Sequence, residues 1–154
     1  MSTLREQMID AMLSKLALIR TANGYLTEVG TTVFVWFPSE SQVLTLPSVN
    51  LRDTSAELDC KMAGRGKLAH KVSFEVLAMM ETTASTGKTD LCNLHSDLTK
   101  WLYNGGDKTF GGFSIETEHD GSESRIFQQE DVVAAVKLKF TTLFVTSEGD
   151  ESAK

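Results

Sequence analysis

The sequence predicts an α+β fold in which a mainly antiparallel β-sheet carries two helices on one face. Its 154 residues, 41 % apolar and 23 % charged, are typical of one globular domain. The two helical patterns, near residues 3–22 and 89–103, are separated by groups of strand-like segments and do not alternate with single strands. We therefore predict one domain over residues 1–146. Residues 147–154 hold acidic side chains and no large apolar group, so we expect a flexible acidic tail there.

The first helix is predicted by a capping signal followed by one apolar stripe. Thr3 and Glu6 have the spacing of a capping box, in which each side chain satisfies a free backbone amide. Apolar residues then recur at spacings of three and four, which places them on one helix face: Leu4, Met8, Ile9, Met12, Leu13, Leu16 and Ile19. Asn23-Gly24 tolerates the left-handed backbone that ends helices, so we expect the helix to stop before it.

Two strands and a long loop are predicted before the middle of the chain. Residues 31–37 are apolar on both faces, which indicates a strand that is either central or covered by a second subunit. Residues 43–51 form a second strand, which Pro47 confines to an edge or to an irregular start. Residues 52–66 are polar and contain two glycines, so we expect a loop with room for a short strand over 57–62.

In the second half of the sequence we predict a long strand, a helix and a β-rich end. Residues 68–81 alternate apolar and polar side chains, and Leu91, Leu94, Leu98 and Leu102 form the stripe of the 89–103 helix. Asp120-Gly121 is a strong signal for a two-residue turn, so we predict a hairpin with arms at 113–119 and 122–127. The longest strand is expected over 132–145.

The charge is unevenly distributed along the chain. The whole sequence carries 15 basic and 21 acidic residues, a net charge of −6. Residues 52–71 hold 5 basic and 3 acidic groups, whereas residues 113–154 hold 4 and 9. A net acidic chain argues against general nucleic-acid coating, and no apolar run reaches the ~20 residues of a membrane span. With only Cys60 and Cys92, we expect no disulfide framework and a reduced, intracellular setting. The early charges Arg5, Glu6 and Asp10 predict that no signal peptide is present.

Motifs with catalytic potential are incomplete. Thr86-Gly87-Lys88-Thr89 ends like a phosphate-binding loop, but position 82 is threonine where that loop needs glycine, so we expect a helix start. Cys92 and His95 could share one helix face as a thiol–imidazole pair, although cysteine is more often a small buried apolar residue. No histidine spacing fits a zinc site. The carboxylate pairs Glu57/Asp59 and Glu116/Glu118 fit a solvated surface better than acid–base chemistry. We expect no cofactor, no metal and no enzymatic activity.

The candidate interaction site is the basic segment between residues 52 and 71, together with one tryptophan. Its functional interpretation is a docking surface for an acidic neighbour, and its alternative is a solvated loop. No aromatic residue interrupts the segment, which disfavours stacking on single-stranded nucleic acid. Trp36 belongs to the apolar strand and could serve as core or as an interface anchor. The candidate interface residues are Arg52, Lys61, Arg65, Lys67, Lys71 and Trp36.

The order of these segments resembles the tail terminator, or tail completion, proteins of long-tailed bacteriophages. The resemblance rests on the opening helix Leu4–Ile19, the Leu46-Pro47-Ser48-Val49-Asn50-Leu51 segment, the basic loop before the 71–81 strand, the 91–103 helix and the closing 137–145 strand. It extends over about residues 3–146. The Phe34-Val35-Trp36-Phe37 strand departs from some relatives.

The resemblance implies a structural protein of the virion, made in the host cytoplasm. Such proteins form rings, commonly hexamers, that cap the tail tube, end its polymerisation and join it to the neck or head. The implied partners are other copies of the chain, the tail-tube protein and a neck or head-completion protein, with genomic DNA passing through the lumen without sequence-specific binding. The alternatives are a tail-tube, neck or baseplate subunit and, more distantly, a small thiol-dependent enzyme that uses Cys92 and His95.

Overall fold

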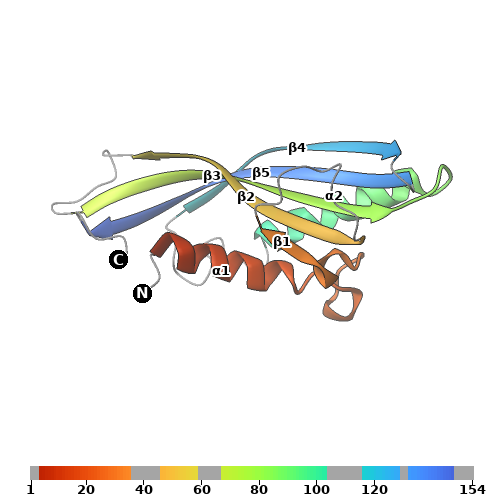
Figure 1. Ribbon diagram of the computed structural model, residues 1–154, viewed down its shortest axis with the longest axis horizontal. Helices are drawn as coiled ribbons and strands as arrows, with labels where there is room; N and C mark the ends of the chain where they lie inside the picture. Colours follow the sequence, from red (N-terminus) through yellow and green to blue (C-terminus); the bar gives the residue numbers. More distant parts are fainter. Residues whose placement is uncertain (1–3, 36–45, 59–66, 104–115, 129–131, 148–154) are drawn as a thin grey trace.

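The computed structural model of the chain describes residues 4–35, 46–58, 67–103, 116–128 and 132–147, and we describe those parts. They form a twisted five-stranded sheet with two α-helices packed on one face (Figure 1). The elements are α1 (Leu4–Leu16), β1 (Val33–Val35), β2 (Ser48–Leu58), β3 (Lys67–Glu81), α2 (Gly87–Tyr103), β4 (Glu116–Gln128) and β5 (Val132–Ser147). This arrangement confirms the predicted α+β class.

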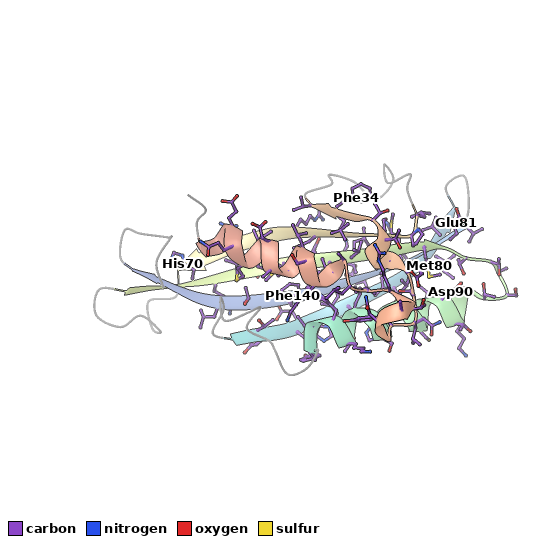
Figure 2. The ribbon with its side chains drawn as sticks, turned by 90° about the horizontal axis from the view of Figure 1, so that it is seen from below. Phe34, His70, Met80, Glu81, Asp90 and Phe140 are labelled. Carbon is purple, nitrogen blue, oxygen red and sulfur yellow. The ribbon has the colours of Figure 1, made fainter. Side chains whose placement is uncertain are left out.

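The strand order is β1-β2-β3-β5-β4. β1 runs parallel to β2, and the other three neighbouring pairs are antiparallel. β3 and β5 pair along their whole lengths and form the long axis of the sheet. Figure 2 accordingly shows His70 and Glu81, which lie near the two ends of β3, on opposite sides of the view.

The core lies between the helices and the sheet face that they cover, which we call the inner face. Four alternate side chains of β3 are buried there, as the alternation predicted, together with four of β5: Val72, Phe74, Val76, Ala78, Ala134, Val136, Leu138 and Phe140. Phe74 stacks on Phe140 with ring centroids 5.3 Å apart, and Trp101 of α2 meets Phe140 edge-on at 5.6 Å. Full burial of such aromatic side chains supplies much of the stability of a domain this size.

Helix α1 ends at Leu16, earlier than the predicted boundary near residue 22. Beyond it the backbone tightens, because the amides of Leu18 and Ile19 bond carbonyls three positions back. The Ile19 carbonyl instead accepts the amide of Gly30 at 2.9 Å. A side chain at Gly30 would lie 2.6 Å from the Leu16 carbonyl oxygen, so this close crossing requires glycine.

The Asn23-Gly24 dipeptide ends a helix, as predicted, but this helix is a short 3₁₀ helix and not α1. Gly24 has φ +88° and ends the short 3₁₀ helix Thr21–Asn23 that follows α1. Thr3, the proposed capping residue, lies outside the described part of the chain.

The strand β1 rules out one of the two alternatives for residues 31–37, a central strand, and leaves the other, a strand covered by a second subunit, as a prediction. It comprises Val33–Val35 and is the outermost strand of the sheet beside β2. Val35 is 45 % exposed, and Trp36 and Phe37 fall outside the described residues. The apolar character of this segment therefore does not reflect burial at the centre of the sheet.

The strand β2 corrects the prediction of a loop over residues 52–66. It runs through Arg52 to Leu58, because these polar residues pair with His70–Glu75 of β3. It also starts at Ser48, immediately after Pro47, which agrees with an irregular start at that proline. The region expected to hold the rest of the loop, residues 59–66, lies outside the described residues.

The predicted hairpin at Asp120-Gly121 is wrong. Residues 116–128 form the single strand β4, which pairs with β5 on both sides of this dipeptide. Gly121 has φ +144°, and the register shifts between His119 and Gly121, so the dipeptide forms a β-bulge. The sequence signal was a real one, because both a turn and this bulge require a glycine with positive φ. The chain does not turn back here because β4 stays paired with the long strand β5.

A buried carboxylate ties α2 to the segment that follows α1. Asp97 is 1 % exposed and accepts hydrogen bonds from the amides of Leu26 (2.9 Å) and Thr27 (2.8 Å) and from the Thr27 hydroxyl (2.5 Å). Lys100 donates to the Gly24 carbonyl at 2.9 Å and lies 4.6 Å from the centre of the Tyr25 ring. Burial, and the charge of Asp97 secondarily, raise the pKa of Tyr25.

Candidate subunit interface

The sheet face opposite the helices, which we call the outer face, holds one of the predicted interface residues in a defined contact. The Arg52 guanidinium donates from Nε (3.0 Å) and Nη2 (2.8 Å) to Glu75 Oε2. Arg52 on β2 and Glu75 on β3 are direct register partners, so the sheet itself places the two groups together. The Arg52 side chain is 39 % exposed and that of Glu75 15 % exposed.

The same pairing continues across the sheet. Glu75 is the register partner of Lys139 on β5, and Lys139 Nζ lies 3.4 Å from Glu123 Oε1 on β4. The four side chains therefore follow one another across β2, β3, β5 and β4 with alternating charge. We call them the charge row: Arg52, Glu75, Lys139 and Glu123. Opposite charges in adjacent cross-strand positions stabilise a sheet modestly, whereas like charges there destabilise it.

The basic segment predicted as one patch is distributed over two strands. Arg52 lies on β2 and Lys71 on β3, where Lys71 is exposed and pairs in register with Glu57. Lys67 begins β3, and its side chain is not among those described. Lys61, Arg65 and Trp36 lie outside the described residues. The structure thus places two of the six predicted interface side chains, and only Arg52 belongs to the charge row.

The strand β4 is the other outer strand of the sheet and is strongly exposed. Its side chains from Ser122 to Ile126 are all exposed, and Ile126 retains 46 % of its surface. At the opposite side of the sheet, β1 covers only the Val49–Leu51 part of β2. Among the described strands, nothing pairs with the outer side of Arg52–Leu58 or of β4. We call these two stretches, which are unpaired among the described strands, the free edges of the sheet.

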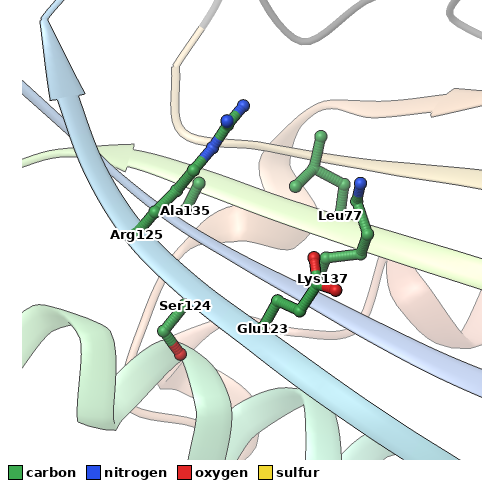
Figure 3. Close-up of a pocket in the computed structure, with 6 residues that line it drawn as sticks. All are labelled: Leu77, Glu123, Ser124, Arg125, Ala135 and Lys137. Atoms are coloured by element: carbon green, nitrogen blue, oxygen red, sulfur yellow. The ribbon is translucent and has the colours of Figure 1, made fainter.

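A shallow cavity of about 150 Å³ lies on the outer face beside the charge row (Figure 3). Leu77 and Ala135 line it together with the charged side chains of Glu123, Arg125 and Lys137. Figure 3 shows the Ser124 side chain directed toward α2, away from these charges. The cavity is small compared with typical ligand pockets of about 300–1,000 Å³. Its charged wall lies beside the β4 edge and belongs to the same surface.

The Cys92–His95 pair is not assembled as a thiol–imidazole couple in the structure. Both residues lie on α2, and Cys92 is an exposed free cysteine. The His95 Nε2 atom instead lies 3.0 Å from the Ser122 hydroxyl of β4. This contact helps to hold α2 against β4, and it occupies one of the two imidazole nitrogens of His95.

The Thr86–Thr89 segment forms the start of α2, as predicted. The Thr86 carbonyl accepts the Asp90 amide at 2.9 Å, and Gly87 is the first helical residue. The Thr83 and Thr86 hydroxyls lie 2.8 Å apart, and the Thr82 hydroxyl donates to Asp90 Oδ2 at 2.5 Å. The threonine hydroxyls before α2 therefore bond to one another and to Asp90. A phosphate-binding loop would instead present free backbone amides at this place.

The described segments contain neither a cluster of metal-binding side chains nor a helix suited to cross a membrane. Within them, no set of three or more His, Cys, Asp or Glu side chains could hold a metal ion. No α-helix in the same segments combines the length and hydrophobicity of a transmembrane span.

Comparison with protein-family models gives no match to this chain, and comparison with curated proteins gives none either.

Three members of the charge row were not among the predicted interface residues. These residues, Glu75, Lys139 and Glu123, lie on three different strands. The register pairs Glu75 with Lys139, and Glu123, whose own register partner is Lys137, reaches Lys139 diagonally. The alternation of Lys137 and Lys139 with apolar residues in the sequence places both lysines on one face of the strand, but it does not reveal their partners. The predicted hairpin at Asp120-Gly121 would have folded Glu123 back on a different strand, which is why its place beside Lys139 could not be anticipated.

Proposed function

We propose that this chain is a structural virion protein, a tail terminator that assembles into a ring on the end of a bacteriophage tail tube. The observation that carries the proposal is the pair of different free edges on one sheet, β4 on one side and the Arg52–Leu58 part of β2 on the other. A cyclic ring needs head-to-tail contacts between two unlike, complementary surfaces of each subunit.

The order of elements supports the same proposal. The amphipathic helix, the Leu46–Leu51 segment leading into a strand, the long β3, the α2 helix and the closing β5 follow in the sequence order of tail terminator proteins. We expect the ring, hexameric by analogy with that group, to stop polymerisation of the tail tube and to bind a neck or head-completion protein. The net charge of −6 would let DNA pass through a lumen without sticking.

The purified protein should form one discrete ring, seen by analytical ultracentrifugation and by negative-stain electron microscopy. Added to the tail-tube protein of the same virus, it should cap tubes and limit their length. A monomer at every concentration that does not bind tubes would contradict the proposal. Open-ended polymerisation of the chain by itself would instead favour the alternative, a tail-tube subunit.

A further inference from the structure

The charge row has unlike ends at the two free edges of the sheet. It begins with the cation Arg52 on β2 and ends with the anion Glu123 on β4. The Glu123 side chain is 68 % exposed, so its carboxylate, which lies 3.4 Å from Lys139, remains accessible from the edge. If a second copy extended the sheet at this edge, the next group in the alternation would have to be a cation.

The strand directions allow such an extension. β2 runs antiparallel to β3, β3 to β5 and β5 to β4, so β2 and β4 of one copy point in opposite directions. A second copy added side by side in the same orientation would therefore pair its β2 antiparallel with β4 of the first. Antiparallel pairing lets backbone amides and carbonyls of both edges bond directly.

We propose that copies of this chain join by pairing the Thr117–Glu123 part of the β4 edge of one with the Arg52–Leu58 edge of the next, with Glu123 placed beside Arg52. Because β1 occupies the Val49–Leu51 part of β2, the contact ends there and Ser124–Gln128 of β4 diverges from the neighbouring sheet. The alternation of the charge row then continues without interruption from subunit to subunit. The contact is head-to-tail, so it generates a ring or an open filament. This inference rests on the proposed function for its ring-forming role and names the surfaces that would make the ring.

Both edges also carry an irregularity at a comparable position. β2 shifts register between Asp53 and Ser55, and β4 shifts between His119 and Gly121. With Glu123 beside Arg52, antiparallel pairing brings these two bulges opposite each other within one residue. Bulges and charges on edge strands can also serve to prevent pairing. An edge protected in that way would leave the chain monomeric, which the experiment below detects.

A charge-swap cycle tests the contact. In Glu123→Arg an arginine would face Arg52 of the next copy, and in Arg52→Glu a glutamate would face Glu123. Like charges at an interface oppose association, so each single variant should weaken self-association by about tenfold or more. The double variant E123R/R52E restores an opposite pair between copies and should recover assembly to within about threefold of the unmodified protein.

Rescue in the double variant cannot come from within one chain. Positions 52 and 123 lie three strands apart, which is roughly 14 Å at the usual strand spacing of about 4.8 Å. That separation exceeds the screening length of about 8 Å at physiological ionic strength. Inside each chain both changes place like charges beside Glu75 and Lys139, so intrachain effects of the two substitutions add and do not cancel.

Matched controls reverse exposed charges away from the edges. Asp10→Arg on α1 changes the net charge as much as E123R, and Lys88→Glu on α2 changes it as much as R52E. Both controls should assemble like the unmodified chain. Sedimentation equilibrium measures association, and circular dichroism with thermal unfolding establishes that each variant is folded.

The outcomes separate the two proposals. Assembly of the unmodified chain with loss in both single variants and recovery in the double variant supports the edge contact. The edge contact is overturned if the single variants associate as strongly as the unmodified chain, or if the double variant associates no more strongly than the single variants. Either result leaves the ring proposal standing. A chain that stays monomeric at all concentrations overturns the edge contact, and if it also fails to bind tail tubes it overturns the ring proposal as well.

Discussion

The two faces of the sheet differ in what their side chains contact. The inner face is continuous apolar surface beneath α1 and α2, and Phe74, Phe140 and Trp101 are each at most 1 % exposed there. The outer face carries the charge row, whose members remain 15–68 % exposed. Alternation along the same strands produces both surfaces. Around the charge row, stability and surface chemistry are therefore assigned to alternate residues, and substitutions on the two faces should have separable effects. Toward one end of the outer face the division is lost, because Leu77, Met79, Val133 and Ala135 form a second buried apolar cluster there.

The largest expected effect lies at the centre of the inner face. Phe74→Ala should lower the free energy of unfolding by about 3–5 kcal/mol, because it leaves a cavity beside Phe140. Urea unfolding followed by circular dichroism measures the change. Lys71→Ala, on the same strand but exposed, is the control and should cost about 0.5 kcal/mol or less. A loss below about 1 kcal/mol in F74A would show that the inner face does not carry the core.

A smaller loss is expected where a polar group is buried on the helix side. Asp97→Ala removes the acceptor for the amides of Leu26 and Thr27 and for the Thr27 hydroxyl. Leaving such buried donors unsatisfied should cost about 2–3 kcal/mol in the free energy of unfolding. Hydrogen exchange at the two amides should accelerate at the same time. Unchanged protection of both amides would contradict the role given to this carboxylate.

The β4 bulge should show an intermediate effect, because it lies at an edge and not in the core. Gly121→Ala places a side chain at φ +144° with no atom within 4 Å of the added carbon, so its cost is purely conformational. We expect about 1–3 kcal/mol less stability. Ser122→Ala is unsuitable as a control because of its contact with His95, whereas Ser124→Ala on the same strand should be close to neutral. A neutral G121A would indicate that the chain does not adopt this backbone conformation.

The smallest effect on folding is expected on the outer face. Arg52→Gln breaks the ion pair with Glu75, but the arginine is 39 % exposed, so solvent screens the interaction. The free energy of unfolding should fall by about 0–1 kcal/mol. The comparison of faces would fail if R52Q cost as much as F74A. Thermal unfolding at low and high salt measures the effect, which added salt should reduce.

The sequence correctly predicted those elements in which the apolar periodicity of the residues matches the side chains that are buried. The long strands near 68–81 and 132–145 and the helix near 89–103 agree with β3, β5 and α2 within about two residues. The failures occur where tertiary pairing overrides local signals. Arg52–Leu58 is polar yet extends β2 because β3 offers it a partner, and Asp120-Gly121 bulges within β4 because β5 continues beside it.

The candidate interface was only partly accessible from sequence. A run of basic residues can be recognised in the chain, and Arg52 was among them. The partners that give Arg52 its place in the charge row come from three other strands, and strand register cannot be deduced from composition. The two edges of the sheet are likewise a property of strand order, which local patterns do not contain.

The carboxylate of Asp97 has a consequence for the growing polypeptide on the ribosome. It bonds to amides about 70 positions earlier in the chain, and β5, which closes the core, comes later still. The segment that leads from α1 to β1 therefore waits for its anchor until α2 has been translated and released from the exit tunnel. Until then the amides of Leu26 and Thr27 lack the buried acceptor that fixes this segment in the finished fold.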